Sequence, residues 1–277
     1  MWKKAEIGIR GLRLAVDVPV CDATAPAAES RNDVDYASLD DVDYASLDGT
    51  GIGLVWQRAT DLLCDYLQQP AAVRLLLERG EVLELGAGVG VVGLVAAAAG
   101  ARVILTDYHP RVLETLRSNI TANGLSEHAS VETLEWGAGR AGASRARLIL
   151  GADLVVAERV APLLASTLHS TLHEADGVFL YAHQERHAIF LGSDGAVCRE
   201  EDDVPLMRLK EAAQPLRTRL LHTRVGHGEA ERVLLLAFGS QLALSALPGW
   251  SDDVHAQPGA GVEAPEPVRQ GCGAVST

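Results

Sequence analysis

The stretch best suited to chemistry is a glycine-rich loop between an apolar strand and an apolar helix. It reads ELGAGVG, Glu84–Gly90, and overlaps the end of the apolar run Val82–Leu85. Gly86 and Gly88 lack a Cβ, so the backbone can turn tightly there and approach a ligand closely. The helix that follows has unpaired N–H groups at its N-terminus. The pattern predicts a ligand-binding turn.

An acidic residue follows the loop at a separation typical of nucleoside-binding folds. Asp107 closes a second apolar strand, Val103–Leu105, about 20 residues after the loop. A carboxylate in that position can accept hydrogen bonds from both hydroxyl groups of a ribose. The loop and Asp107 together predict a cofactor that contains a nucleoside.

The identity of this cofactor depends on where the turn begins. GVGVVG, Gly88–Gly93, is a literal G-x-G-x-x-G, so an NAD-dependent oxidoreductase is one alternative. The predicted strand ends at Leu85, however, which makes Gly86 the first residue of the turn. Glu84 lies where dinucleotide folds prefer an apolar residue, and an acid there suits the charged amino-acid portion of S-adenosylmethionine. We therefore expect S-adenosylmethionine, with NAD and a glycine-rich turn in some other α/β protein as alternatives.

Strands and helices alternate along most of the chain. This alternation, with nearly continuous apolar strands, predicts an α/β fold with a mainly parallel sheet and helices on both faces. Ligands then bind at the carboxyl ends of the strands. The remaining strands are expected within 130–136, 147–156, 177–184, 217–225 and 231–240, and helices within 54–69, 111–125 and 161–172.

The ends of the chain differ in composition from its centre. Alternating apolar residues around Gly11 predict an N-terminal β-hairpin within residues 1–20. Residues 21–50 are acidic and contain DVDYASLD twice in succession, which predicts a disordered insertion. A folded domain is expected over 51–246, and the Pro/Gly-rich residues 247–277 are expected to be disordered.

Charge and composition limit the partners. The formal net charge of −13 lies mostly in the two segments expected to be disordered, and it disfavours nucleic acid. No apolar run approaches the roughly 20 residues that span a bilayer, and none suits a signal peptide. HQERH, residues 183–187, follows a strand rather than lying in a helix, so no metal site is expected. We expect a cytoplasmic protein with isolated, reduced cysteines at Cys21, Cys64, Cys198 and Cys272.

Several motifs carry a family resemblance. VLELGAGVG, ILTD, SNITANGL, LEW and LILGADLVVAE resemble, in order and spacing, the seven-β-strand (class I) S-adenosylmethionine-dependent methyltransferases. Within that class the chain is most similar to the lysine methyltransferase family 16, whose members also carry the VW seen at Val55–Trp56. The resemblance covers roughly residues 53–240. It implies a Rossmann-like seven-stranded sheet with the last strand antiparallel, and methyl transfer to a lysine of a protein substrate.

The resemblance also implies which residues bind the cofactor. Trp56 would lie beside its methionine end, Asp107 would hold its ribose, and Trp136 would lie at its adenine. The other residues expected to shape or line the cofactor site are Glu84, Gly86, Ala87, Gly88 and Ala152.

The substrate side departs from the family pattern. Where the family has D-x-x-Y, this chain has Asp153 and then Val156 in place of the tyrosine. Asp153 and Glu158 are expected to orient the cationic side chain of the substrate, although Glu158 could equally be a solvated surface carboxylate. The loss of the tyrosine leaves two alternatives: a class I methyltransferase acting on a small molecule or another side chain, and a catalytically silent binding module.

Overall fold

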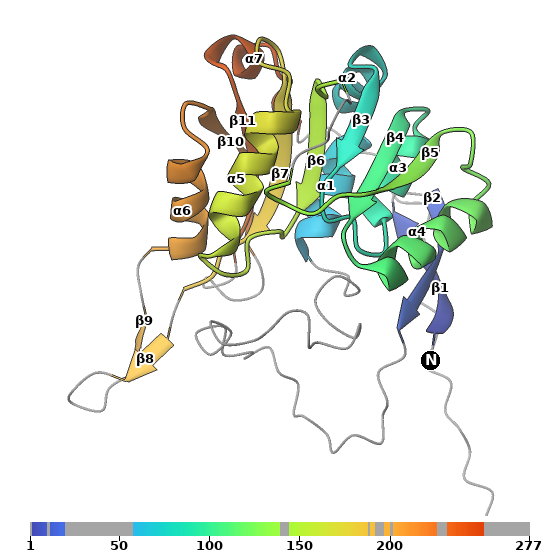
Figure 1. Cartoon of the computed structure of the whole chain (residues 1–277), viewed down its shortest axis with the longest axis horizontal. Helices are drawn as coiled ribbons and strands as arrows, with labels where there is room; N and C mark the ends of the chain where they lie inside the picture. The colour runs from blue at the N-terminus through green and yellow to red at the C-terminus, as the bar shows by residue number, and fades with distance from the viewer. Residues whose placement is uncertain are drawn as a thin grey trace, which may run out of the picture.

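A seven-stranded sheet forms the centre of the computed structural model, which describes residues 2–9, 12–19, 58–138, 144–187, 189–191, 197–199, 202–225 and 232–251. The strand order is β10-β11-β7-β6-β3-β4-β5 (Figure 1). The strands are β3 (Glu81–Glu84), β4 (Arg102–Asp107), β5 (Ala129–Thr133), β6 (Leu148–Ala152), β7 (Val178–Gln184), β10 (Arg217–Val225) and β11 (Arg232–Gly239).

The strand directions confirm the expected fold class. β3 runs parallel to β4 and β6, β4 runs parallel to β5, and β6 runs parallel to β7. β11, the last strand, is antiparallel to both β7 and β10. The chain moves outward from β3 to β5 and then returns to β6 on the other side of β3. The carboxyl ends of β3 and β6 therefore lie at the topological switch point, where open α/β sheets bind ligands.

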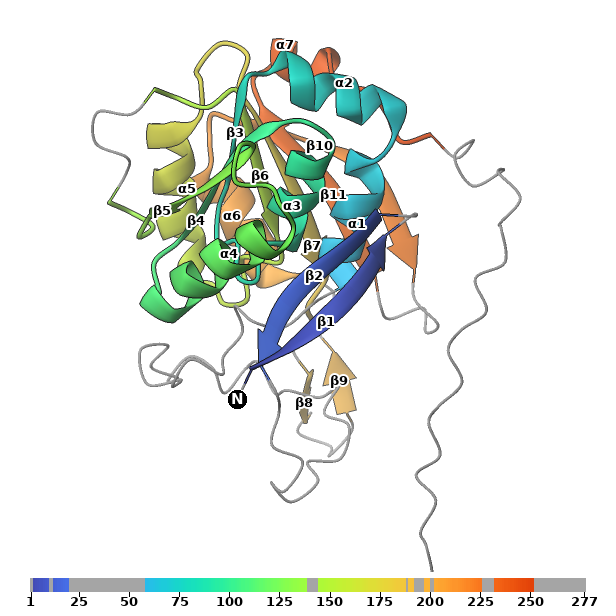
Figure 2. The ribbon, with the colours of Figure 1, turned by 90° about the vertical axis from the view of Figure 1, so that its right-hand side faces the viewer.

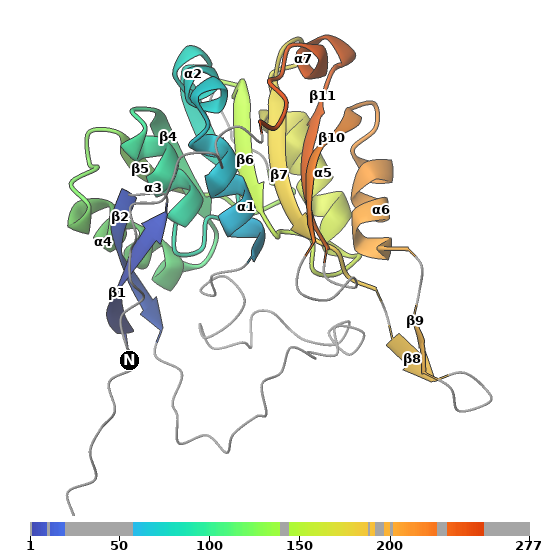
Figure 3. The ribbon, with the colours of Figure 1, turned by 180° about the vertical axis from the view of Figure 1, so that it is seen from behind.

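Helices cover both faces of the sheet. α1 (Arg58–Leu67), α3 (Val91–Ala98) and α4 (Pro110–Ala122) contribute to one buried cluster, and α5 (Val160–Thr171) and α6 (Val204–Ala212) contribute to the other. Figure 1 shows α5 and α6 in front of the sheet. Figure 3 views the sheet from its other face and shows α1 lying over that face.

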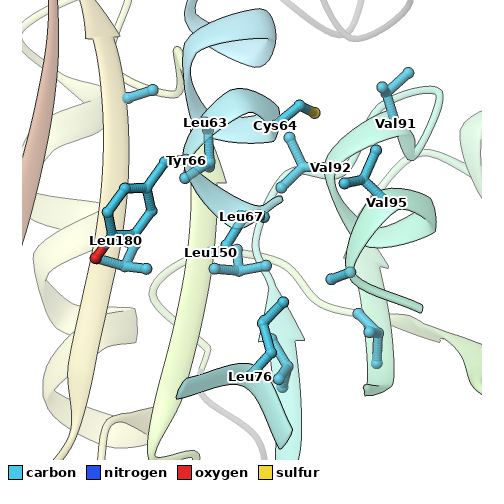
Figure 4. Close-up of a cluster of buried hydrophobic side chains, with 14 of the residues drawn as sticks. Leu63, Cys64, Tyr66, Leu67, Leu76, Val91, Val92, Val95, Leu150 and Leu180 are labelled. Atoms are coloured by element: carbon cyan, nitrogen blue, oxygen red, sulfur yellow. The ribbon is translucent and has the colours of Figure 1, made fainter. Parts of the chain in front are cut away.

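The apolar strands supply side chains to both buried clusters. Leu150 of β6 faces the α1 and α3 side, where Figure 4 shows it near Leu67, while Ile149 belongs to the cluster of α5 and α6. Because successive strand residues point to opposite faces, a strand covered on both faces must be apolar throughout. This requirement explains why the continuous apolar runs of the sequence locate the central strands.

The N-terminal hairpin is confirmed and begins earlier than the alternating pattern indicates. β1 (Trp2–Ile9) pairs with β2 (Leu12–Pro19) in antiparallel register. Figure 2 shows the hairpin beside α3 and α4. At the end of α4, Asn123 accepts a hydrogen bond from the N–H of Ala15 at 2.8 Å and donates one to its carbonyl oxygen at 2.7 Å. The two bonds join the hairpin to the helical layer.

Some elements escape the sequence analysis. α2 (Pro70–Glu78) follows α1 almost directly, and α6 buries only Leu206 and Leu209. The short α7 (Gln241–Ser245) and the separate hairpin of β8 (Ile189–Leu191) and β9 (Val197–Arg199) were also not predicted. None of the helices in the described ranges is long and apolar enough to cross a membrane.

The packed chain continues beyond the expected domain end at residue 246. Leu247 is buried, and the ring of Trp250 stacks on His222 with centroids 3.9 Å apart. These contacts hold the backbone as far as Ser251, whose N–H bonds to Gln69. The prediction of disorder for 21–50, and that for 247–277 beyond residue 251, concern residues outside the described ranges, so the division into domains stays a prediction.

Candidate functional site

The glycine loop forms the turn expected at the carboxyl end of β3. Gly86, Gly88 and Gly90 have φ values of 56°, 55° and 86°, a region that favours glycine. The N–H of Ala87 donates to the carbonyl oxygen of Thr106 at 2.8 Å, which fixes the loop to the end of β4. β3 ends at Glu84, one residue before the predicted end, so the turn starts before Gly88.

Asp107 lies against this loop. Its Oδ2 accepts a hydrogen bond from the N–H of Gly88 at 3.3 Å, and its Oδ1 accepts one from the N–H of His109 at 3.1 Å. Burial raises the pKa of the Asp107 carboxyl, and the backbone bonds from His109, Gly88 and Tyr108 oppose that rise. The structure therefore brings together the loop and the acid on which the expectation of a nucleoside rests.

Trp136 also lies against this loop. A Cβ added to Gly86 would lie 3.0 Å from Cζ2 of Trp136 and 2.9 Å from Cδ2 of Leu154. The indole is half-buried in the loop after β5 and packs on the cluster beneath α5. Gly86 thus leaves room for the indole, and Gly86, Asp107 and Trp136 gather around one turn.

Glu84 is buried beneath the loop and points at α3. Its Oε2 accepts a hydrogen bond from the N–H of Gly93 at 2.9 Å, in the first turn of the helix, where a negative charge is favoured. Burial raises the pKa of Glu84 to about 8; the Gly93 bond lowers it and the charge of Asp107 raises it further. The contact that the structure shows is with the helix, and binding of a charged cofactor group by Glu84 stays a prediction.

A methyl group at Gly93 is expected to destabilise the protein. Its Cβ would lie 2.3 Å from Oε2 of Glu84 and 2.8 Å from Cγ of Leu105. Overpacking of this kind costs about 1–3 kcal/mol, more than the roughly 0.5–1 kcal/mol that alanine gains over glycine in a helix. Urea unfolding of Gly93→Ala should show this loss. Gly249→Ala, where a Cβ meets no atom within 4 Å, is the control. An unfolding midpoint for Gly93→Ala at or above that of the wild type would show that the Glu84 carboxylate does not lie against Gly93.

Asp153 lies at the expected edge of the sheet, but its carboxylate is already bound. It directly follows Ala152, the last residue of β6, which is partly buried against the core. Asp153 has a φ of 55°, unusual for a residue other than glycine. Its Oδ1 and Oδ2 accept hydrogen bonds from Nη1 and Nη2 of Arg186 at 2.6 and 2.5 Å. No pattern in the sequence predicts this ion pair.

Glu158 lies on the surface. Its Oε2 accepts a hydrogen bond from Nε of Arg208 on α6 at 3.3 Å, and both side chains are more than half exposed. The pair belongs to an open hollow of about 480 Å³ between α5 and α6, lined by Glu158, Arg159, Pro162, Arg208, Glu211 and Ala212. This placement favours the alternative role of a solvated surface carboxylate. Trp56 lies outside the described residues.

A buried polar chain lies beside Asp153. The hydroxyl of Tyr181 accepts a hydrogen bond from the N–H of Val155 at 3.1 Å and lies 2.9 Å from Nδ1 of His183. Nε2 of His183 lies 2.7 Å from Oδ2 of Asp203. Burial raises the pKa of the Tyr181 hydroxyl above its ordinary value. Burial would also raise the pKa of Asp203, but the bonds from His183, Arg186 and Leu206 outweigh it, so that this pKa is lowered.

These hydrogen-bonded side chains could not be predicted as a group because they come from separate elements. Tyr181 and His183 belong to β7, whereas Asp203 is the N-cap of α6. The only signal in the sequence was the run YAHQER, whose polar residues begin within the apolar strand and continue past its end. Across the described ranges, no group of three or more His, Cys, Asp or Glu side chains is arranged to hold a metal ion.

The fold and the site define a class of protein. It is a doubly wound α/β protein in which a glycine turn, an acid and an aromatic ring meet at the carboxyl edge of the sheet, beside the switch point. A model of the lysine methyltransferase family matches residues 41–191, and the chain belongs to this family.

Individual relatives agree with this family. The chain is 34% identical over 159 residues to Protein N-lysine methyltransferase METTL21A of Xenopus tropicalis, which covers 56% of this chain and 66% of that protein. It is 37% identical over 129 residues to EEF1A lysine methyltransferase 3 of Mus musculus, covering 44% of this chain and 53% of that protein. It is 30% identical over 159 residues to Protein-lysine N-methyltransferase EFM6 of Saccharomyces cerevisiae, covering 48% and 64%. The chain therefore spans between about half and two thirds of the length of these relatives.

Proposed function

We propose that the chain is an S-adenosylmethionine-dependent methyltransferase that modifies a lysine side chain of a protein substrate. The observation that carries the proposal is the bond between Asp107 and the glycine loop at Gly88, with Trp136 against the same loop, in a member of the lysine methyltransferase family. The names of the relatives support a protein lysine as the acceptor.

The residues around the loop fit this cofactor. The Asp107 carboxylate would accept the ribose hydroxyls, the half-buried Trp136 would lie at the adenine, and Glu84 would face the charged amino-acid portion. The bend of Gly86–Gly88 leaves the backbone open to close approach. Ala152 would line the pocket, and Trp56, which lies outside the described residues, would lie beside the methionine end. When bound, S-adenosylmethionine supplies a methyl group that its sulfonium activates.

The protein must bring an uncharged amine to this edge of the sheet. A free lysine has a pKa near 10.4, so the amine must lose a proton, which goes to water, before it can accept a methyl group. Alignment of the two reactants is then the main contribution that the protein makes. Asp153, which follows β6, is the carboxylate proposed to orient the amine, whereas Glu158 is exposed and paired with Arg208.

The direction of β11 supports S-adenosylmethionine rather than NAD as the cofactor. The usual dinucleotide fold is a parallel sheet in the order 3-2-1-4-5-6, whereas β11 here is antiparallel to both of its neighbours.

Titration calorimetry with each cofactor tests the proposal. We expect saturable binding of S-adenosylmethionine and none of NAD; binding of NAD alone would overturn the proposal.

The acceptor is expected to be a protein rather than a nucleic acid or a membrane. EEF1A, named in the mouse relative, is the first purified acceptor to assay.

We further propose that the protein acts in the cytoplasm, because its isolated cysteines suit a reducing compartment.

Replacing Trp136 with alanine is expected to weaken cofactor binding more than it lowers stability. Stacking of a base on an aromatic ring contributes about 1–3 kcal/mol, which corresponds to a roughly 5- to 150-fold weaker affinity. The half-buried ring leaves only part of its area to the core, so the loss of stability should be smaller. Calorimetry and urea unfolding measure the two effects. Trp250→Ala, which removes another half-buried tryptophan, should lower stability and leave the affinity unchanged; equal losses of affinity in both variants would contradict the assignment.

A further inference from the structure

The carboxylate that faces the proposed acceptor site is held by a cation of the protein itself. Both oxygens of Asp153 accept hydrogen bonds from the guanidinium of Arg186, and Oδ1 also accepts a long one from the N–H of Gln184 at 3.4 Å. The Asp153 side chain is 2% exposed and that of Arg186 is 10% exposed. A paired and buried carboxylate of this kind is not available as a free anion to an incoming ammonium group.

Arg186 is fixed in place from two directions. Its backbone N–H donates to Oδ2 of Asp203 at 2.7 Å, and its Nη1 also donates to the carbonyl oxygen of Gln184 at 2.9 Å. Asp203 in turn accepts from the N–H of Leu206 at 2.9 Å and so caps α6. The guanidinium is therefore held at the end of β7, and the backbone of the same residue is held by the N-cap of α6.

The buried polar chain continues from Asp203 back to the segment that carries Asp153. His183 bonds Asp203 through Nε2 and lies within hydrogen-bond distance of the Tyr181 hydroxyl, which accepts from the N–H of Val155. The loop after β6, the end of β7 and the start of α6 are thus joined in one hydrogen-bonded system. Because these hydrogen bonds fix the surrounding segments, they can hold Asp153 at its positive φ.

We propose that Arg186 is a positioning residue that neutralises Asp153, so that the acceptor amine meets an ion pair rather than a free carboxylate. This inference rests on the proposed function. A free carboxylate beside the amine would stabilise its ammonium form, which cannot accept a methyl group. A carboxylate already paired with a guanidinium exerts much less of that effect, while it still accepts hydrogen bonds and shapes the site.

The test uses two cofactor analogues and needs no acceptor protein. S-adenosylhomocysteine lacks the methyl group, and sinefungin carries a charged amine where the methyl group would be. The measured quantity is the ratio of their dissociation constants, obtained by calorimetry for the full chain. In Arg186→Gln the freed Asp153 should attract the sinefungin amine, so that sinefungin binding tightens about tenfold or more relative to S-adenosylhomocysteine.

Two further variants separate this effect from a loss of structure. Arg186→Lys keeps the charge but loses the two-point contact, so a smaller tightening of about threefold is expected; it also serves if Arg186→Gln fails to fold. The double variant Arg186→Gln, Asp153→Asn removes the freed charge and should restore the wild-type ratio. A merely structural role would weaken both analogues equally and leave the ratio unchanged.

The outcomes separate this inference from the proposed function. Failure of the wild type to bind either analogue would overturn the proposed function and the inference with it. Binding of both analogues, with the same ratio in the wild type, Arg186→Gln and Arg186→Lys, would overturn the inference alone.

Discussion

Replacing Asp107 with alanine is expected to weaken S-adenosylmethionine binding by at least about 100-fold. Hydrogen bonds to a charged group contribute about 1.5–3 kcal/mol each, and the carboxylate is proposed to accept two from the ribose. A loss of about 3 kcal/mol corresponds to more than 100-fold in affinity. The substitution also removes the acceptor of the N–H groups of Gly88 and His109, so the loop loses one of its supports.

Calorimetry on two matched variants measures this effect. Asp107→Asn keeps the volume of the side chain but places an amide donor against a backbone N–H, so its affinity should fall nearly as far. Glu158→Gln makes the same change of carboxylate to amide on an exposed side chain and should bind like the wild type. If Asp107→Ala binds within about threefold of the wild type, the proposed ribose contact is wrong.

Replacing Glu84 with glutamine is expected to stabilise the protein at alkaline pH. The pKa of Glu84 is about 8 in the folded protein and near its ordinary 4.5 when unfolded. Between these values the folded state holds a proton that the unfolded state has released, so stability falls as pH rises through this window. The contribution lost by the time the pH exceeds the folded pKa is roughly 5 kcal/mol. Glutamine is neutral throughout and can still accept the Gly93 bond.

Urea unfolding across this pH range tests the prediction. The wild type should lose stability between about pH 5 and pH 9, and Glu84→Gln should lose much less. Glu158→Gln should follow the wild-type curve. Parallel curves for the wild type and Glu84→Gln would mean that Glu84 is not buried as the structure shows.

If the ammonium group of the cofactor lies near Glu84, it favours the ionised carboxylate, so the affinity of the wild type for S-adenosylmethionine should also rise with pH up to about 8.

The parts of the site that depend on local sequence could be predicted. The glycine turn, Asp107 and the central strands follow from residue types at short spacing, because a strand buried on both faces must be apolar and a tight turn favours glycine. Trp136 was placed by the family resemblance, and the structure sets it against Gly86.

The contacts that depend on tertiary packing could not be predicted. Arg186 meets Asp153 only because β6 and β7 are neighbours in the sheet, and both residues lie just past the strand ends. The bond of Glu84 to Gly93 depends in the same way on how α3 enters behind the loop. Neither pairing has a spacing rule that a single sequence reveals.

The protein is proposed to transfer a methyl group from S-adenosylmethionine to a protein lysine at this site. The most direct measurement incubates the purified chain and methyl-labelled S-adenosylmethionine with an extract of cells that lack this protein, followed by mass spectrometry of the labelled products. We expect label on a lysine side chain of a protein, and no label when Asp107→Ala replaces the wild type. Label on a small molecule or another side chain, or no label from a wild-type protein that binds the cofactor, would contradict the account.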